Sequence, residues 1–171
     1  MNANDSIREL LKTGLGVLPQ THELRSTTLF DTLDVLAASE YPLFVGLTAR
    51  SGDKALTNIE QANSLPDPDN FALTGLSIIL SANGAAADVA KVLEKSTTRI
   101  DVGGRTIFEG PLSAIAYQGS GTVGLREIYD LAYPQLIKPA ARITGYILTK
   151  TAAVAAVNTQ VVLHGVRITK R

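Results

Sequence analysis

The sequence predicts one mainly β domain, built as an antiparallel sandwich or barrel, and two observations lead to this fold class. Eight runs rich in β-branched and aromatic residues recur along the chain, and turn-forming residues separate most of them. These runs do not alternate with long helical segments, as the strands of a parallel α/β sheet would. The length of 171 residues and the hydrophobic content of 45% fit a single domain with a full-sized core.

Alternation of apolar and polar residues locates the individual strands. They are predicted near residues 26–31, 42–49, 70–82, 97–102, 105–109, 112–117, 142–150 and 159–169. The strongest local signal is the pair of runs on either side of Gly103-Gly104, because adjacent glycines accept the positive φ angles of a type I′ hairpin turn. The run 70–82 carries apolar residues on both faces, so both of its sides are expected to be partly covered. Residues 32–40 fit either a helix or a strand.

Two or three short helices are expected beside the strands. Residues 1–18 form a predicted amphipathic arm that can be capped by Asn4 or Asp5, and residues 19–171 form the single β domain. Segments 85–95 and 123–132 also place apolar residues at helical spacing, and Pro134 follows the second segment.

Charge is divided unevenly along a chain whose formal net charge is zero. Residues 1–130 hold all 16 acidic residues and 10 of the 16 basic ones. The remaining bases are Lys138, Arg142, Lys150, Arg167, Lys170 and Arg171, with no acid among them. This asymmetry indicates either a surface that meets something of opposite charge or solvated strand ends.

Cofactor and metal signatures are weak. Residues 119–124 match GxGxxG, but a dinucleotide site needs an acidic residue about 20 positions later, and no acid follows Asp130. A glycine turn leading into a helix is the better interpretation. His22 and His164 lie far apart in the sequence and form no metal-binding motif, so His164 is expected to be a packed or rim residue. Cysteine is absent, which excludes disulfides and thiolate chemistry. No cofactor and no metal are therefore predicted.

Catalytic and nucleic-acid signatures are equally weak. Asp31 with Asp34, and Glu127 with Asp130, have spacings typical of exposed surface, and nothing marks Ser113 as a nucleophile. The C-terminal bases are spread out with Tyr146 as the single aromatic among them, which does not indicate specific nucleic-acid binding. The sequence favours a non-enzymatic protein.

Two stretches resemble a known family. The first is FALTGLSIILSANGAAADVAKVLEKSTTRIDVGGRTIFEGPLSAIA, and the second is QVVLHGVRIT near the C-terminus. Together they resemble capsid proteins of tailless icosahedral phages that contain an internal membrane. The size and the eight strands look like the single jelly-roll, small major capsid protein of the sphaerolipovirus type, found in phages of Thermus. The resemblance rests on the order and texture of the segments.

The resemblance implies a single eight-stranded jelly roll that takes part in the shell of a virion and is made in the host cytoplasm. Its implied partners are other copies of itself as a dimer or higher oligomer, a second, larger capsid protein and the viral membrane surface. Candidate interface residues are the apolar side chains of the arm and the last bases of the chain: Leu10, Leu11, Leu15, Val17, Leu18, Arg167, Lys170 and Arg171. The arm is expected to dock either on its own domain or on a neighbouring subunit. The alternative function is a β-sandwich binding module, such as a phage spike or a glycan- or lipid-binding domain.

Overall fold

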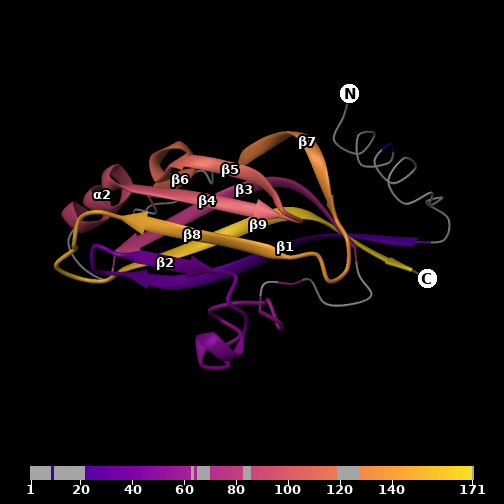
Figure 1. The fold of residues 1–171 in the computed structure, drawn as a ribbon, viewed down its shortest axis with the longest axis horizontal. Helices are drawn as coiled ribbons and strands as arrows, with labels where there is room; N and C mark the ends of the chain where they lie inside the picture. The colour runs from indigo at the N-terminus through magenta and orange to yellow at the C-terminus, as the bar shows by residue number, and fades with distance from the viewer. Residues whose placement is uncertain are drawn as a thin grey trace.

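The protein is a sandwich of two β-sheets, seen in a computed structural model (Figure 1). The structure describes residues 9, 22–62, 64, 70–82, 86–118 and 128–170. The first sheet contains β1 (His22–Val35), β9 (Val157–Lys170), β3 (Asn70–Ala82), β6 (Ala116–Gln118) and β7 (Tyr129–Ile137). The second sheet contains β2 (Glu40–Leu43), β8 (Ile143–Thr149), β4 (Ser96–Val102) and β5 (Arg105–Pro111).

The strands of both sheets pair antiparallel, with one short exception. The first sheet has the order β1-β9-β3, and two strands then share the far edge of β3. β7 pairs antiparallel with the first half of β3, whereas the three residues of β6 pair parallel with its second half. The second sheet has the order β2-β8-β4-β5.

The core lies between the two sheets because alternate side chains of each strand point inward. In β4, Ser96, Thr98, Ile100 and Val102 are buried, while the residues between them are more exposed. The inward side chains of the first sheet include Leu73 and Leu163, which belong to the same apolar cluster as Ile100 of the second sheet. This period-two burial is the physical reason why these segments form strands.

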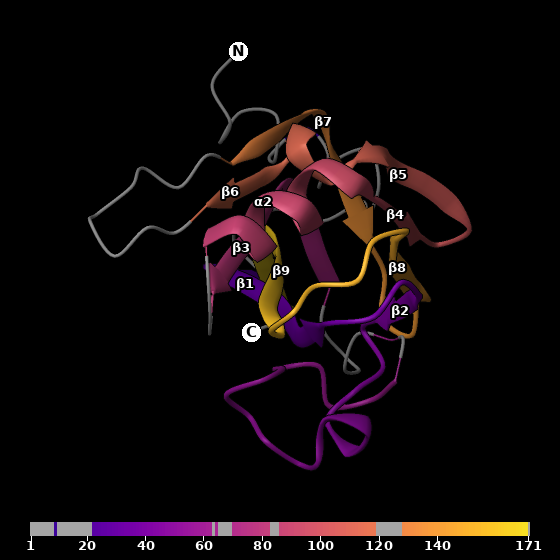
Figure 2. The same cartoon turned by 90° about the vertical axis from the view of Figure 1, so that its left-hand side faces the viewer.

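Short helices cover parts of the periphery. The helix α2 (Ala86–Lys95) follows β3 and lies at one end of the sandwich, where Val89 and Val92 are buried (Figure 2). Two single turns of 3-10 helix, η2 (Thr48–Arg50) and η3 (Leu112–Ala114), lie in connections. From residue 22 onward, α2 is the single α-helix of the described chain.

Several sequence predictions are confirmed. The fold is mainly β, and it is a two-sheet sandwich rather than a closed barrel. The predicted strand 70–82 has the bounds of β3. The hairpin between β4 and β5 turns at Gly103 and Gly104, whose φ angles are 58° and 81°. The predicted helix 85–95 corresponds to α2.

Other predictions are wrong in part. The predicted helix 123–132 is overturned at its end, because residues from Tyr129 onward form β7; residues 123–127 lie outside the described part of the chain. Pairing with β3 overrides the helical spacing there. The predicted strand 112–117 begins instead as η3. The predicted strand 42–49 ends at Leu43, since Phe44 and Gly46 have positive φ angles that break the ladder. The undecided segment 32–40 continues β1 as far as Val35.

Connections gather at two ends of the sandwich. The terminal end is defined here by the start of β1, the end of β9, the hairpin at 103–104 and the connection 138–142 between β7 and β8. The opposite end carries α2, the connection 36–39 and the connection 150–156 between β8 and β9.

Candidate interaction surfaces

The terminal end carries a group of exposed basic residues. They are Arg105, Lys138, Arg142 and Arg167. The hairpin and the β7–β8 connection touch each other, because the Gly103 N–H donates to the Arg142 carbonyl at 2.8 Å. Phe71 of β3 pairs with Arg167 of β9 on one side and with Ile137 of β7 on the other. Arg167 and Ile137 are therefore level with each other across the sheet, and Lys138 directly follows Ile137. We call these four residues the basic rim.

The fold sorts the predicted C-terminal bases into two groups. Lys138, Arg142 and Arg167 share the terminal end, whereas Lys150 lies at the opposite end. Lys170 is the last residue of β9. Arg105 also belongs to the basic rim, although it comes from the part of the sequence that holds all the acidic residues. This was not predicted from the sequence. The available signal was its position directly after the Gly103-Gly104 turn, which places it at the end of the sandwich. The remaining predicted interface residues lie outside the described residues: Leu10, Leu11, Leu15, Val17, Leu18 and Arg171.

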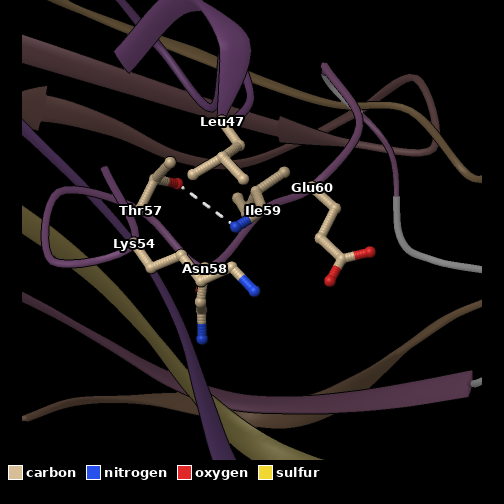
Figure 3. A pocket seen from close by; sticks show the side chains of 6 residues that line it. All are labelled: Leu47, Lys54, Thr57, Asn58, Ile59 and Glu60. Carbon is tan, nitrogen blue, oxygen red and sulfur yellow. Dashed lines mark hydrogen bonds between the residues drawn. The ribbon is translucent and has the colours of Figure 1, made fainter. Parts of the chain in front are cut away.

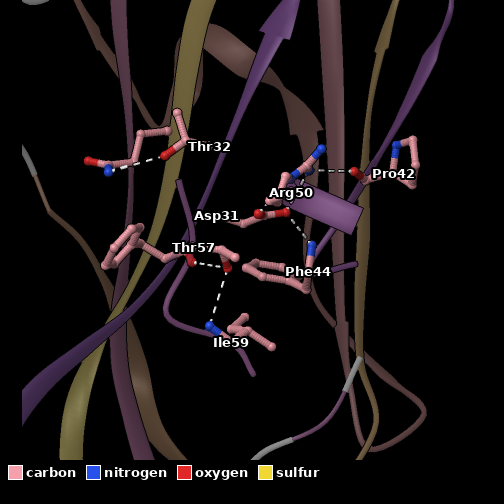
Figure 4. Close-up of polar contacts among 9 residues, drawn as sticks. Asp31, Thr32, Pro42, Phe44, Arg50, Thr57 and Ile59 are labelled. Carbon is pink, nitrogen blue, oxygen red and sulfur yellow. Dashed lines mark hydrogen bonds and ion pairs between the residues drawn. The ribbon is translucent and has the colours of Figure 1, made fainter. Parts of the chain in front are cut away.

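A buried ion pair joins β1 to the connection that follows β2 (Figure 4). The Asp31 carboxylate is 0% exposed and accepts two hydrogen bonds from Arg50, from Nε at 2.9 Å and from Nη2 at 2.7 Å. It accepts a third from the Phe44 N–H at 2.7 Å. Arg50 also donates to the Pro42 carbonyl at 3.2 Å. The prediction that Asp31 is a surface residue is therefore wrong, whereas Asp34 is exposed as expected.

Phe44 is the residue that this ion pair holds in place. Its φ angle is 60°, although a left-handed backbone costs about 1–2 kcal/mol for a residue with a β-carbon. Its side chain is fully buried in the core, and its N–H points at Asp31. The burial of the ring and the charged hydrogen bond together stabilise a conformation that phenylalanine rarely adopts.

The same connection covers the outer edge of β1. Leu56 accepts a hydrogen bond from the Thr32 N–H at 2.7 Å, and the Thr57 hydroxyl donates to the Phe30 carbonyl at 2.9 Å. The Asn58 side chain makes two hydrogen bonds to the backbone of β1, as a neighbouring strand would. Its amide N–H donates to the Thr28 carbonyl at 2.7 Å, and its amide oxygen accepts from the Phe30 N–H at 2.8 Å. An edge whose hydrogen-bonding groups are occupied cannot recruit another strand. We call residues 28–32 of β1 the covered edge.

Two hollows lie beside this connection, and both are small. One has a volume of about 90 Å³ and is lined by Leu47, Lys54, Thr57, Asn58, Ile59 and Glu60 (Figure 3). The other, of about 250 Å³, lies between β1, Tyr41 and Arg50. Sites for drug-sized ligands usually enclose roughly 300–1,000 Å³. The hollows therefore give weak support for a small-molecule site.

His164 and Ser113 are two other residues considered as a possible metal ligand and a possible nucleophile. His164 is half-buried, and its Nε2 lies 2.7 Å from the hydroxyl of buried Ser77, which agrees with the expectation of a packed or rim residue. Ser113 is exposed in η3. Within the described ranges, no group of three or more potential metal ligands was found. The GxGxxG segment lies outside the described residues.

The acids Asp88 and Asp101 have pKa values below the ordinary value. Hydrogen bonds from the backbone of Ala155 and Val154, and from Lys91, lower the pKa of Asp88 below its ordinary value. For Asp101, burial raises the pKa, but hydrogen bonds from Thr106 and Arg99 outweigh it, and the net shift is downward. Both carboxylates are therefore held ionised by contacts within the fold.

Comparison with known proteins adds no identity. The sequence matches no known family model and no curated protein. In the part of the chain that the structure describes, no helix is long and apolar enough to cross a membrane.

Proposed function

We propose that this chain is a structural subunit of a virus capsid, folded as a jelly roll, whose work is done by contact surfaces. The observation that carries the proposal is the pairing of the long strands. In a jelly roll, one ribbon of antiparallel pairs rolls up, so the first strand pairs with the eighth, the second with the seventh, the third with the sixth and the fourth with the fifth. Without the three-residue β6, the observed pairs are β1 with β9, β2 with β8, β3 with β7 and β4 with β5.

Jelly rolls also occur in lectins and cupins, so the fold alone does not choose the function. The resemblance of residues 71–116 and 160–169 to phage capsid proteins favours a shell subunit. The covered edge adds physical support, because subunits packed at high local concentration must avoid random strand pairing. In the proposed shell, the subunit associates with itself and with a second, larger capsid protein above a lipid membrane, and the complete virion is its location.

Electron microscopy and light scattering of the purified full-length protein test this proposal. We expect regular oligomers, sheets or particles whose amount increases with protein concentration. Parallel samples contain vesicles of phosphatidylglycerol or of phosphatidylcholine, which separate an anionic membrane contact from a neutral one. A monodisperse monomer under all of these conditions, or turnover of a substrate by the purified protein, contradicts the proposal.

The basic residues near the C-terminus provide a charge-specific test. Replacing Arg167, Lys170 and Arg171 with serine should weaken assembly or vesicle binding more at low salt than at high salt, because ionic strength screens exposed charges. The matched control replaces three exposed lysines outside the basic rim: Lys54, Lys95 and Lys150. If both triple variants lose assembly equally, the net charge of the protein is responsible and not the position of Arg167, Lys170 and Arg171. If neither changes assembly at any ionic strength, the charge hypothesis is wrong.

A further inference from the structure

The outer face of the first sheet carries a small apolar cluster that is separate from the main core. Ala72 and Ile168 form it, with Leu136 and Val166 packed beside them. Their neighbours in sequence point inward, since Phe71 and Leu73 belong to the main core. Leu24 pairs with Ile168 in the adjacent strand and is 40% exposed. We call these five residues the outer patch.

Two residues of the outer patch, Ala72 and Ile168, are so deeply buried that they require a cover. Ala72 and Ile168 are 0% exposed, although they face away from the space between the sheets. Leu136 and Val166 cannot shield them from above, because both are strand neighbours that pair with Ala72 in the same sheet. A side chain on the outer face of a two-layer sandwich contacts water unless a third layer lies over it.

We propose that the N-terminal segment 1–18 of the same chain is this third layer, docked on the outer patch through its apolar face. Composition selects this segment among the longer stretches that lie outside the described residues. It carries the apolar residues Ile7, Leu10, Leu11, Leu15, Val17 and Leu18. By contrast, residues 65–69 read LPDPD, and residues 119–127 read GSGTVGLRE, so neither offers a continuous apolar face.

Connectivity and length agree with this occupant. Three residues, 19–21, separate the segment from β1, whose third residue is Leu24 of the outer patch. The residues after the predicted Asn4 cap, 5–18, would extend about 21 Å as a continuous helix and farther in any less compact form. The distance across the sheet from β1 to β7 is three strand spacings, or roughly 14 Å. The segment is therefore long enough to cross the patch without leaving its own domain.

Introduced cysteine pairs test the proposal cleanly, because the natural chain contains no cysteine. Three double variants combine Val166→Cys with Leu10→Cys, Leu11→Cys or Leu15→Cys. In each matched control, the arm cysteine is kept and Thr97→Cys takes the place of Val166→Cys. Thr97 is an exposed residue of the other sheet. A short bifunctional maleimide is added, and products are resolved on a denaturing gel and by mass spectrometry. Circular dichroism verifies that each variant keeps its β spectrum.

The expected result is crosslinking within one chain for at least one Val166 pair, several-fold faster than for its Thr97 control. Crosslinks that form only between two chains overturn the proposal in favour of a second copy as the occupant. Equal rates for the Val166 and Thr97 pairs also overturn it and point to another segment as the cover. The proposal does not depend on the capsid function, so either can fail without the other.

Discussion

Asp31 and Asp88 are two buried carboxylates that fasten connections to the sandwich, and they do so with different partners. Asp31 binds one backbone N–H, that of Phe44, and a bidentate Arg50 whose side chain is only 16% exposed. Asp88 binds the Ala155 N–H at 3.0 Å and Lys91 at 3.1 Å, and the lysine side chain is 43% exposed. Asp31 holds the connection that follows β2. Asp88 holds the connection between β8 and β9, at the end of the sandwich that carries α2.

The difference lies in what compensates the negative charge. A buried carboxylate with a buried cation depends on that cation, because water cannot replace it. An acid that is held by backbone N–H groups and a solvated lysine depends mainly on the backbone, since exposed ion pairs contribute little. Loss of the cation should therefore reduce the free energy of unfolding much more at Asp31 than at Asp88.

The largest effect is expected for Arg50→Met, which leaves the Asp31 carboxylate buried without its cation. The free energy of unfolding should fall by about 3–5 kcal/mol, the usual loss when one partner of a buried pair is removed. Urea denaturation measures this change. The released connection would also expose the covered edge, so aggregation above the transition should increase.

The double variant Asp31→Asn with Arg50→Met is the control for this prediction. It carries no uncompensated charge and should lose less stability than Arg50→Met alone. If Arg50→Met costs under about 1 kcal/mol, the pair behaves like an exposed one and the proposed contrast with Asp88 disappears.

Asp88 provides the second test, through pH. Its pKa in the folded chain lies below the ordinary 3.8, so its contribution to stability is present above that value and is lost as the pH falls through the folded pKa. Asp88→Asn should be less stable than the natural protein at neutral pH, by less than the loss for Arg50→Met. Urea midpoints between neutral pH and about pH 3 should show the gap narrowing on the acidic side. A gap that is independent of pH contradicts the charged role of Asp88.

Sequence reasoning could not find these two sites, although it predicted most of the strands. Strand positions follow from period-two alternation, which is a local property, and the Gly103-Gly104 turn is equally local. The burial of Asp31 depends on Arg50, 19 residues later, and on a positive φ at Phe44 that no local pattern indicates. An acid three positions from another acid looks like surface until the tertiary fold places an arginine beside it.

The strand β7 shows a different failure. Its sequence, YDLAYPQLI, lacks regular alternation, and Tyr133 is 78% exposed. An edge strand with one partner needs only one side of its backbone paired, so Pro134 is tolerated there. The helical spacing of Leu125, Ile128 and Tyr129 was therefore the stronger local signal, and contact with β3 reversed it at Tyr129.

A smaller effect is expected at Asn58, which sharpens the description of the connection beside Asp31. Asn58→Ala removes two neutral hydrogen bonds to β1, at Thr28 and Phe30, while leaving the ion pair intact. Water can reach this exposed position, so the loss of stability should be about 1 kcal/mol. Urea denaturation gives the value, and Asn58→Asp is the control that keeps one acceptor. A loss as large as that of Arg50→Met would mean that neutral bonds, and not the buried charge, hold the connection.

The smallest effect should come from Lys91→Met, the counterpart of Arg50→Met at the other carboxylate. The lysine is one helical turn from Asp88, and its ammonium group stays largely in water, so its loss should change the free energy of unfolding by less than about 0.5 kcal/mol. The backbone N–H groups continue to compensate Asp88, and the helix dipole favours an acid in the first turn of α2. Raising the salt concentration should erase even this small difference, because the pair is accessible to counterions. A loss that approaches that of Arg50→Met would show that Asp88, like Asp31, depends on its cation and that the two fastenings work in the same way.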